Sequence, residues 1–421
     1  MTGCKTAAVD PLDAAPSPQA TAEPAPLAAV PATQSSAQPA PDAGPPPEPM
    51  RTDKELPADT PHELVRELVR EPGRDAGLKE VVRDAKELAG YELLAVVRTG
   101  EGPPAPKGPE VNAAGIDAAR RKTEAHLRIE ASQTRARFVL SGGFVLPSGT
   151  ELRARADRYG HLVFLPGEDT YRIAEPGALR ALVGERRLDV APLSPARVVS
   201  PGDGAPRLSL RTRRVEVTTR AASAMFELAT LREAGEGGVL VCRLLLDLMS
   251  APPSASACGA DEVPLHAELR WKTQGSLVFD VTSLARRTDM PMQELAAPPS
   301  TSRFAPDLPP LPPGGALLSK ADLAALRNGP VDVPPPPRDA GVPPPEAGLL
   351  LVDGSDELRV AWIDGVPAAW VAPGGRELLP SLVRGRYTLQ WRTALGDSWS
   401  DAQTVNVPGA SELGARDAPV R

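Results

Sequence analysis

The distribution of proline constrains the folding of this chain more than any other feature of its sequence. Proline accounts for 50 of the 421 residues and is concentrated near residues 11–61 and 298–345, where aromatic residues are almost absent. Segments rich in Pro, Ala, Ser and Gln bury too little apolar surface to offset the entropy of ordering, and repeated Pro favours extended polyproline II. We therefore expect both blocks to be spacers.

The spacers divide the chain into five segments. We predict a disordered Pro/Ala-rich tether over 1–58, a β-rich α+β domain with an N-terminal helical segment over 59–297, and a disordered Pro-rich linker over 298–347. A small β-sandwich over 348–410 and a disordered tail over 411–421 complete the chain. The segments outside the Pro-rich blocks are long enough for one medium and one small domain.

The charge of the chain argues against nucleic acid as a partner. The formal net charge is −7, whereas nucleic-acid-binding proteins usually carry a basic excess on one face. Arginine-rich stretches such as Arg211–Arg214 have acidic neighbours such as Glu216, which indicates solvated strand faces. The sequence contains no run of about 18 apolar residues, so no segment is predicted to span a bilayer as a helix.

The first residues, Met1-Thr2-Gly3-Cys4-Lys5, place small residues before a cysteine, and a long Pro/Ala/Ser/Gln-rich tail follows. This pattern resembles the lipobox of bacterial lipoproteins, in which the Cys is diacylated. The charged and apolar regions that should precede the Cys are missing, so either the start codon lies upstream or the Cys is accidental. The resemblance implies a lipid anchor on Cys4. Lys5 then implies the outer membrane, facing the periplasm or the cell surface.

Two further cysteines, Cys242 and Cys258, lie about 16 residues apart. The periplasm permits disulfides, and a bridge over a loop of this size would stabilise the fold by roughly 3 kcal/mol. We predict this disulfide, the alternative being a buried Cys242 and a free thiol at Cys258. There is no Cys-x-x-Cys, and the four histidines lack ligand spacing, so we predict no metal site and no cofactor.

Two periodicities organise the segment 59–297. A capping box at Thr60-Pro61-His62-Glu63 and apolar stripes that continue to Leu88 predict helices whose apolar face packs on the domain. From Tyr91 onward the period changes to two, which predicts half-buried strands. Alternating runs begin at Tyr91, Ala125, Leu152, Val215, Leu265 and Leu277. After the run that ends at Ala156, a turn at Tyr159-Gly160 leads into Leu162 and Phe164 and predicts a hairpin.

Helices at Pro176–Arg187 and Val239–Met249 interrupt the strands, and Gly235–Gly238 is predicted to form a turn. The alternating strands together with these helices indicate an α+β fold with a predominantly antiparallel sheet. In a lipoprotein, such a sheet is similar in architecture to the half-barrel of the periplasmic lipoprotein carriers, which shelter an acyl chain in an apolar concavity.

The C-terminal segment is strongly patterned. Strands of alternating apolar residues are followed by turns at Asp364-Gly365 and Gly396-Asp397, which predicts a small β-sandwich. Ile363–Pro367, followed by Arg384–Leu389, resembles the PEGA family of small surface β-domains. Four tryptophans fall in this segment, and they are either core residues or exposed rings that contact carbohydrate or a partner. They are Trp362, Trp370, Trp391 and Trp399.

The Pro-rich linker contains one short helix candidate, Ser319–Arg327, with Ser319 as its N-cap. The polyproline run Pro334–Pro337 is interpreted as rigid linker, the alternative being a ligand for an aromatic groove.

No catalytic motif is present: there is no Gly-x-Ser-x-Gly, no phosphate-binding loop and no His-Glu-x-x-His. We therefore expect a non-enzymatic envelope lipoprotein with a structural or interaction role, whose partners are the membrane and an envelope protein or polysaccharide. The alternatives are a periplasmic carrier of a lipid or other apolar ligand and an unrecognised hydrolase. A filled core would favour the structural or interaction lipoprotein, and an open apolar concavity would favour the carrier. A cleft with convergent titratable groups would favour the hydrolase.

Overall fold

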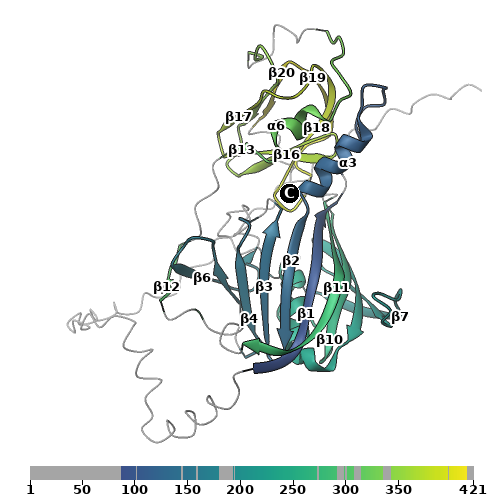
Figure 1. The fold of residues 1–421 in the computed structure, drawn as a ribbon, viewed down its shortest axis with the longest axis vertical. Coiled ribbons are helices and arrows are strands. Elements are labelled where there is room, and N and C mark those ends of the chain that lie inside the picture. Colours follow the sequence, from purple (N-terminus) through teal and green to yellow (C-terminus); the bar gives the residue numbers. More distant parts are fainter. Residues whose placement is uncertain are drawn as a thin grey trace, which may run out of the picture. The chain divides into compact units, whose positions relative to one another are not determined.

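The computed structural model describes residues 87–100, 102–143, 146–157, 160–179, 193, 195–272, 275–291, 298, 301–307, 314–334, 343–396 and 398–414. The predicted tether, Cys4, the helical segment up to residue 86, most of the predicted helix after Pro176 and the C-terminal tail lie outside these residues. Within them the chain is a β-rich α+β protein with mainly antiparallel sheets, as the sequence predicts (Figure 1).

The first β module is built on a twelve-stranded sheet with the order β12-β6-β5-β4-β3-β2-β1-β11-β10-β9-β8-β7. Its neighbouring strands pair antiparallel, except that the short β12 pairs parallel with β6. The strands are β1 (Glu87–Thr99), β2 (Ala125–Ser132), β3 (Arg135–Gly142), β4 (Glu151–Arg155), β5 (His161–Phe164), β6 (Thr170–Ala174), β7 (Arg197–Asp203), β8 (Arg213–Thr218), β9 (Ala222–Thr230), β10 (Glu262–Trp271), β11 (Ser276–Pro291) and β12 (Arg303–Phe304).

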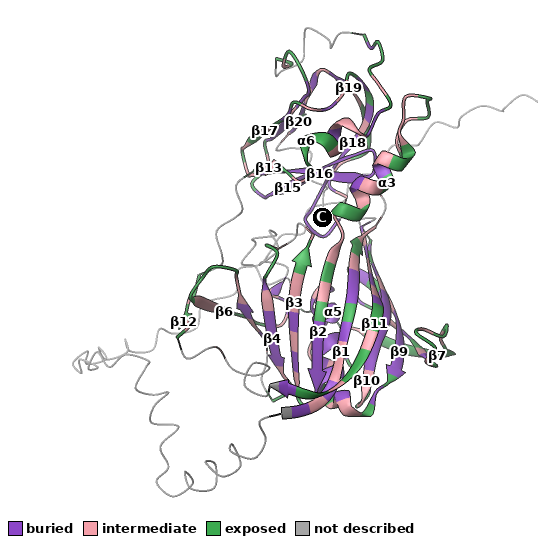
Figure 2. Cartoon of the chain, viewed as in Figure 1, coloured by how far each residue is buried: buried purple, intermediate pink, exposed green. Residues whose placement is uncertain are grey.

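The strand predictions for this module are confirmed, with two differences. Leu88, predicted to continue a helix, lies in β1. In the hairpin after Ala156, the predicted residues Leu162 and Phe164 lie on the outer face, while Val163 and His161 are buried on the inner face. Leu152 pairs with Val163, and because side chains alternate between faces with a period of two, this register sends Leu162 outward. Figure 2 shows this alternation of buried and exposed residues along β1 and β2.

One helix packs on the inner face of this sheet. The helix α5 (Gly235–Asp247) follows the 3-10 turn η1 (Arg232–Ala234) and contacts β2, β3, β4 and β10. Because β2 and β10 are separated by two other strands in the sheet, the sheet must curve around the helix for both to reach it. The prediction of a helix here is confirmed, but it begins earlier than expected.

The glycines at 235–238 therefore do not form the predicted turn but the first turn of α5. A Cβ on Gly237 would lie 2.4 Å from the carbonyl oxygen of Arg135, and one on Gly238 would lie 2.6 Å from that of Glu262. Neither position can accept a side chain without displacing backbone. The glycines thus let the helix start in close contact with the turn between β2 and β3 and with the first residue of β10.

The second β module is a two-sheet sandwich, which confirms the predicted small β-sandwich. One sheet has the order β13-β16-β15-β18-β19 and the other β17-β14-β20. The strands are β13 (Gly315–Ala316), β14 (Leu349–Asp353), β15 (Arg359–Ile363), β16 (Val366–Val371), β17 (Arg376–Leu379), β18 (Gly385–Arg392), β19 (Gln403–Val407) and β20 (Gly409–Leu413).

This module extends beyond the predicted boundary at residue 348. The helix α6 (Lys320–Ala324), capped by Ser319 as predicted, buries Leu323 in the sandwich core. The helix α3 (Ala113–Lys122), inserted between β1 and β2 and not predicted, adds Ile116 and Ala119 to the same core. Part of the predicted disordered linker is therefore ordered, because its scattered leucines find apolar partners that are distant in sequence.

Candidate functional site

An apolar cavity lies between α5 and the inner face of the large sheet. It has a volume of about 110 Å³ and is lined by side chains from β1, β2, β3, β4, β11 and α5. Leu146, Leu179 and Leu395, which lies between β18 (Gly385–Arg392) and β19 (Gln403–Val407), complete the lining. Thr150 is its single polar residue, and the rest of the lining consists of Val, Ala, Leu and Phe. A cavity with almost no polar partners holds water poorly and favours apolar groups. A cavity of this volume is smaller than most ligand sites, and the side chains around it form an otherwise filled core.

Several side chains that line the cavity remain partly accessible to solvent. Val97, Leu127, Leu140, Leu146 and Leu248 are only half-buried, although they belong to the inner face of the module or to its helix. Leaving such side chains exposed forgoes roughly 1.5–3 kcal/mol for each one that could be fully buried. The inner face therefore retains an apolar surface that an apolar ligand can cover.

A disulfide holds the helix that forms one wall of the cavity. Cys242 of α5 and Cys258, in the segment between α5 and β10, are bonded, with their Cα atoms 6.3 Å apart. Both residues are almost completely buried, which excludes the alternative of a free thiol in an exposed loop. The predicted pairing is confirmed, and it restrains α5 beside the leucines that follow Cys242.

A buried polar pair lies on another side of α5. His161 of β5 and Asp247 at the end of α5 are both 1% exposed, and Nε2 of His161 lies 2.9 Å from Oδ2 of Asp247. Both residues line a second cavity of about 70 Å³, together with Arg155 and Arg243. Nδ1 of His161 and Oδ1 of Asp247 have no hydrogen-bond partner, so this cavity contains buried polar atoms that remain unsatisfied.

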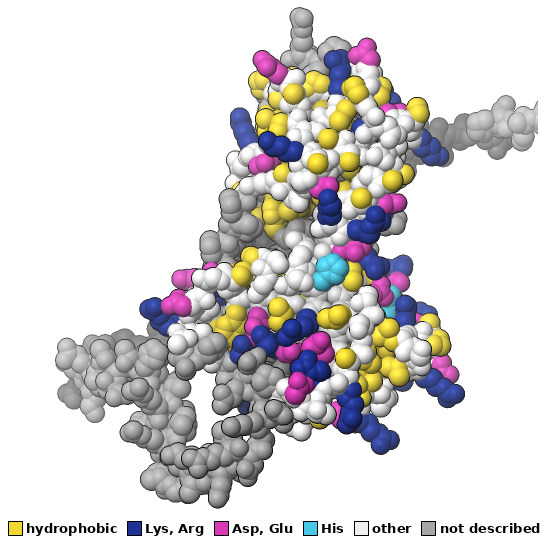
Figure 3. Space-filling model, in the orientation of Figure 1, with side chains coloured by type: hydrophobic (Ala, Val, Ile, Leu, Met, Phe, Trp, Pro, Cys, Tyr) yellow, Lys and Arg dark blue, Asp and Glu magenta, His cyan; other side chains and the backbone are white. Residues whose placement is uncertain are grey.

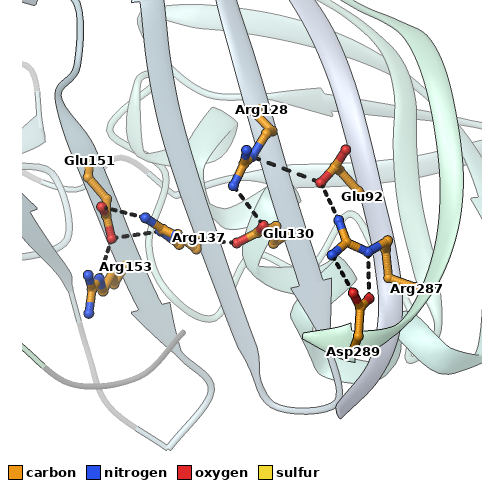
Figure 4. A network of polar contacts seen from close by, with 8 residues as sticks. All are labelled: Glu92, Arg128, Glu130, Arg137, Glu151, Arg153, Arg287 and Asp289. Carbon is orange, nitrogen blue, oxygen red and sulfur yellow. Dashed lines mark hydrogen bonds and ion pairs between the residues drawn. The ribbon is translucent and has the colours of Figure 1, made fainter. Parts of the chain in front are cut away.

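The outer face of the same strands carries a ladder of ion pairs (Figure 4). It runs from Asp289 and Arg287 on β11, through Glu92 on β1, Arg128 and Glu130 on β2, and Arg137 on β3, to Glu151 and Arg153 on β4. Four arginines balance four carboxylates, and Figure 3 shows that charges of both signs are intermixed over this face. A balanced set of this kind stabilises the sheet and does not attract a charged ligand.

Glu151 is the most enclosed carboxylate at the β4 end of this ladder. Burial alone would raise its pKa, but hydrogen bonds from Arg137 and Arg153, together with their charges, lower the pKa below its usual value. Nε of Arg137 lies 2.8 Å from Oε1 of Glu151, and Arg153 donates to the same oxygen. Glu151 is therefore held ionised as a structural anchor between β3 and β4.

The four tryptophans of the second module do not present free ring faces. Trp362 and Trp391 are each 1% exposed, and Trp399 and Trp370 are 7% and 9% exposed. Arg359 stacks on the ring of Trp399 and Arg392 on that of Trp362. The rings therefore lie in the core, as the alternative interpretation predicts, because the two sheets and these arginines cover them. Contact of these residues with carbohydrate or a partner stays a prediction.

No helix within the described ranges is long and apolar enough to cross a membrane, and the residues that the structure describes include no group of three or more His, Cys, Asp or Glu arranged to hold a metal ion. Cys4, the predicted lipidation site, lies outside the described part of the chain.

Sequence reasoning did not identify the two cavities. A signal was present in α5, where Leu240, Leu244, Leu245 and Leu248 form a stripe wider than one packed face requires. A second signal was Asp247, a carboxylate within an apolar run, which needs a buried partner. The identity of that partner, His161, depends on the strand order and could not be derived from spacing.

No family model matches the chain, and no curated protein matches it. Among solved structures, the chain is similar to PNGF-II, with 9% identity and a TM-score of 0.29, over 52% of this chain and 31% of that one. It thus spans about a third of PNGF-II. It is also similar to MucB in complex with MucA(peri), with 13% identity and a TM-score of 0.25, over 79% of this chain and 92% of that one. A second MucA/MucB complex, from Pseudomonas aeruginosa, gives 12% identity and a TM-score of 0.25. At these TM-scores the likenesses carry no argument about fold or function.

Proposed function

We propose that this chain is a non-enzymatic, lipid-anchored protein of the bacterial cell envelope whose first β module binds an acyl chain or a similar apolar group. The apolar cavity beside α5 carries the proposal. Its lining offers shape and apolar contact but almost no polar group that could perform chemistry. A structural or interaction role without an apolar ligand is the alternative, and it predicts no binding of an acyl chain.

The location rests on two observations. The buried disulfide between Cys242 and Cys258 supports an oxidising compartment, because such bonds are rare in the reducing cytoplasm. The lipobox-like start at Cys4, followed by a proline-rich tether, supports attachment to a membrane. In this arrangement the tether lets the module move away from the membrane that holds it.

The second module supports the proposal as a packed scaffold. Its tryptophans and leucines are buried, and its turn at Asp364-Gly365 and strand at Gly385–Arg392 are the features that resemble the PEGA family. We assign it a role in positioning or in contact with another envelope protein. The acyl chain is assigned to the first module.

The test is a binding titration of the full-length protein with a fluorescent fatty acid, 11-(dansylamino)undecanoic acid. The wild-type protein should enhance and blue-shift the dansyl emission. Leu248→Trp places a large ring in the cavity and should weaken binding at least about tenfold, which corresponds to the loss of roughly 1.4 kcal/mol. Leu94→Trp is the matched control, because Leu94 lies on the outer face of β1 and is 43% exposed.

Equal affinity of the wild-type and Leu248→Trp proteins would overturn the assignment of this cavity, and absence of binding by the wild type would overturn the function. The lipid anchor is tested separately with labelled palmitate, using the gene with its upstream DNA. Incorporation that is lost in Cys4→Ala would support the anchor, and no incorporation in either form would remove it.

A further inference from the structure

A cleft with a volume of about 510 Å³, which we name the outer cleft, opens at one end of the large sheet. Its sheet wall consists of the last residues of β1 and β10 and the first residues of β11, and side chains from α3, β15 and β16 also line it. Ser276 and Val278 line the outer cleft, whereas Leu277 between them lines the apolar cavity. The two spaces therefore lie on opposite faces of the sheet. Sites for small molecules usually have about 300–1,000 Å³, so the outer cleft has room for a ligand.

The strand register places a donor, an apolar group and an acceptor side by side in the outer cleft. Val278 of β11 pairs with Arg98 of β1 on one side and with Glu268 of β10 on the other, and all three line the cleft. Arg98 and Glu268 are thus two strand spacings apart, roughly 10 Å, with the half-buried Val278 between them. The next pair along these strands, Arg270 and Ser276, adds a second guanidinium and a hydroxyl.

The charges of the outer cleft are balanced by neighbouring side chains. Each of its three arginines contacts a carboxylate, and the contacts are Arg98 Nε to Glu124 Oε1 at 3.1 Å, Arg270 Nη2 to Glu268 Oε2 at 2.9 Å and Arg120 Nη1 to Asp117 Oδ1 at 3.7 Å. A balanced set of charges does not favour a strongly charged ligand. The guanidiniums of Arg98 and Arg270 nevertheless have more N–H donors than these contacts use, and the carboxylate of Glu268 has further acceptor sites.

These properties select among classes of ligand. An extended peptide could not add to the wall as a strand, because β1, β11 and β10 are interior strands whose backbones pair on both sides. An acyl chain would leave the charged groups of the wall without polar contacts. A sugar ring suits the wall, because its hydroxyls both donate and accept and its C–H groups can cover an apolar side chain.

We infer that the outer cleft binds an uncharged saccharide of one or two rings. Its hydroxyls accept from Arg98 and Arg270 and donate to Glu268, and the C–H groups of a ring lie over Val278. This inference does not rest on the proposed binding of an acyl chain, because the apolar cavity lies on the other face of the sheet.

The test is isothermal titration calorimetry of the full-length protein with three uncharged disaccharides, namely maltose, cellobiose and di-N-acetylchitobiose. At least one of them should bind with a Kd of about 1 mM or tighter. Glucose 6-phosphate is the anionic comparison, and it should bind more weakly than that disaccharide, because the arginines of the cleft are already paired with carboxylates.

A matched pair of variants locates the effect. Glu268→Gln should weaken binding of the disaccharide about tenfold, because a hydroxyl then donates to a neutral amide oxygen in place of a carboxylate. Glu216→Gln is the control, since Glu216 pairs with Arg214 two residues away on β8, as Glu268 does with Arg270 on β10, and does not line the cleft. Both pairs are solvent-exposed and contribute little to stability, so both variants should fold.

Three outcomes would overturn the inference. They are no binding of any of the three disaccharides, tighter binding of glucose 6-phosphate than of each disaccharide, and an equal loss of affinity in Glu268→Gln and Glu216→Gln. The second outcome would identify an anion site instead. Binding of the dansyl fatty acid should be unchanged in Glu268→Gln, so this inference and the proposed function can each fail alone.

Discussion

The two β modules differ in how their apolar cores are packed. The second module buries the large apolar side chains of its core: Leu349, Leu351, Leu379, Tyr387 and Leu389 are all fully buried. The first module leaves a cavity of about 110 Å³ beside α5 and keeps several of its lining leucines half-exposed. Protein cores normally pack as densely as organic crystals, so the cavity beside α5 is a local departure from normal packing in the first module.

The buried charged pairs of the two modules differ in the number of contacts that support them. In the second module, Arg327 and Asp364 are fully buried and form an ion pair at 2.5 Å, and Asp364 also accepts from the backbone nitrogen of Thr388. Arg327 additionally stacks on Tyr387. In the first module, His161 and Asp247 contact one another at 2.9 Å. Each pair leaves a buried polar atom without a hydrogen-bond partner, Nε of Arg327 in one and Nδ1 of His161 and Oδ1 of Asp247 in the other.

The largest effect is expected from breaking the buried pair of the second module. Asn, like Asp, tolerates the positive φ of 52° at position 364, so Asp364→Asn should not strain the backbone. The substitution does leave the charge of Arg327 without its counterion. We expect a loss of about 3–5 kcal/mol in the free energy of unfolding. Urea titration followed by tryptophan fluorescence reports mainly on this module, which contains four of the five tryptophans.

Asp332→Asn is the control for that measurement, because Asp332 is 97% exposed where it pairs with Arg384. An exposed pair of this kind contributes about 0–1 kcal/mol. Similar losses in the two variants would show that the Arg327–Asp364 pair does not hold the second module together.

A smaller effect distinguishes the packed core from the hollow one directly. Leu389→Ala, in the packed core, should cost about 3 kcal/mol, because it removes buried methylenes and leaves a cavity. Leu248→Ala, beside an existing cavity, should cost roughly 1 kcal/mol, because less contact is lost. Thermal unfolding of both variants followed by circular dichroism measures the difference. Equal costs would contradict the comparison between the modules.

The smallest expected effect is an opposite dependence of stability on pH in the two modules. Arg137 and Arg153 lower the pKa of Glu151, so its contribution to the first module is present above the pKa of an unfolded glutamate and is lost as the pH falls through the folded-state pKa. In the second module, burial raises the pKa of Asp353. Its contribution is present below the unfolded pKa of an aspartate and is lost as the pH rises through the raised one.

Glu151→Gln should therefore remove the acid sensitivity of the first module, at a cost of about 1.5–3 kcal/mol at neutral pH from the weakened charged hydrogen bonds. Asp353→Asn should make the second module more stable at neutral pH than the wild type. Urea midpoints at a series of pH values measure both effects, and a second module stabilised by rising pH through the acidic range would contradict the assignment to Asp353.

Local patterns predicted much of the fold. Alternation with a period of two located β1, β2, β8, β10 and β11, because each strand buries one face and exposes the other. The pairing of Cys242 with Cys258 was predicted because these two cysteines remain once Cys4 is set aside and lie about 16 residues apart. The cap at Ser319 predicted α6 within a proline-rich block.

The residues of the candidate site could not be predicted from the same local patterns. His161 and Asp247 are separated by 86 positions in the sequence, and only the strand order brings them together. The hairpin of β4 and β5 shows the same limit, since both Leu162 and Val163 are apolar and only the pairing of Leu152 with Val163 decides which one faces inward. The glycines before α5 resembled a turn until the close approach of the helix to Arg135 and Glu262 explained them.

The sequence by itself determined that this chain is β-rich, that Pro-rich blocks at 11–61 and 298–345 flank its longest globular segment, and that Cys242 and Cys258 pair. These properties depend on composition and on residues near one another. Only the tertiary structure decided that α3 and α6 join the second module, that the tryptophans are buried, and that two cavities lie beside α5. These depend on strand order and register, which bring distant residues together and which no local pattern encodes.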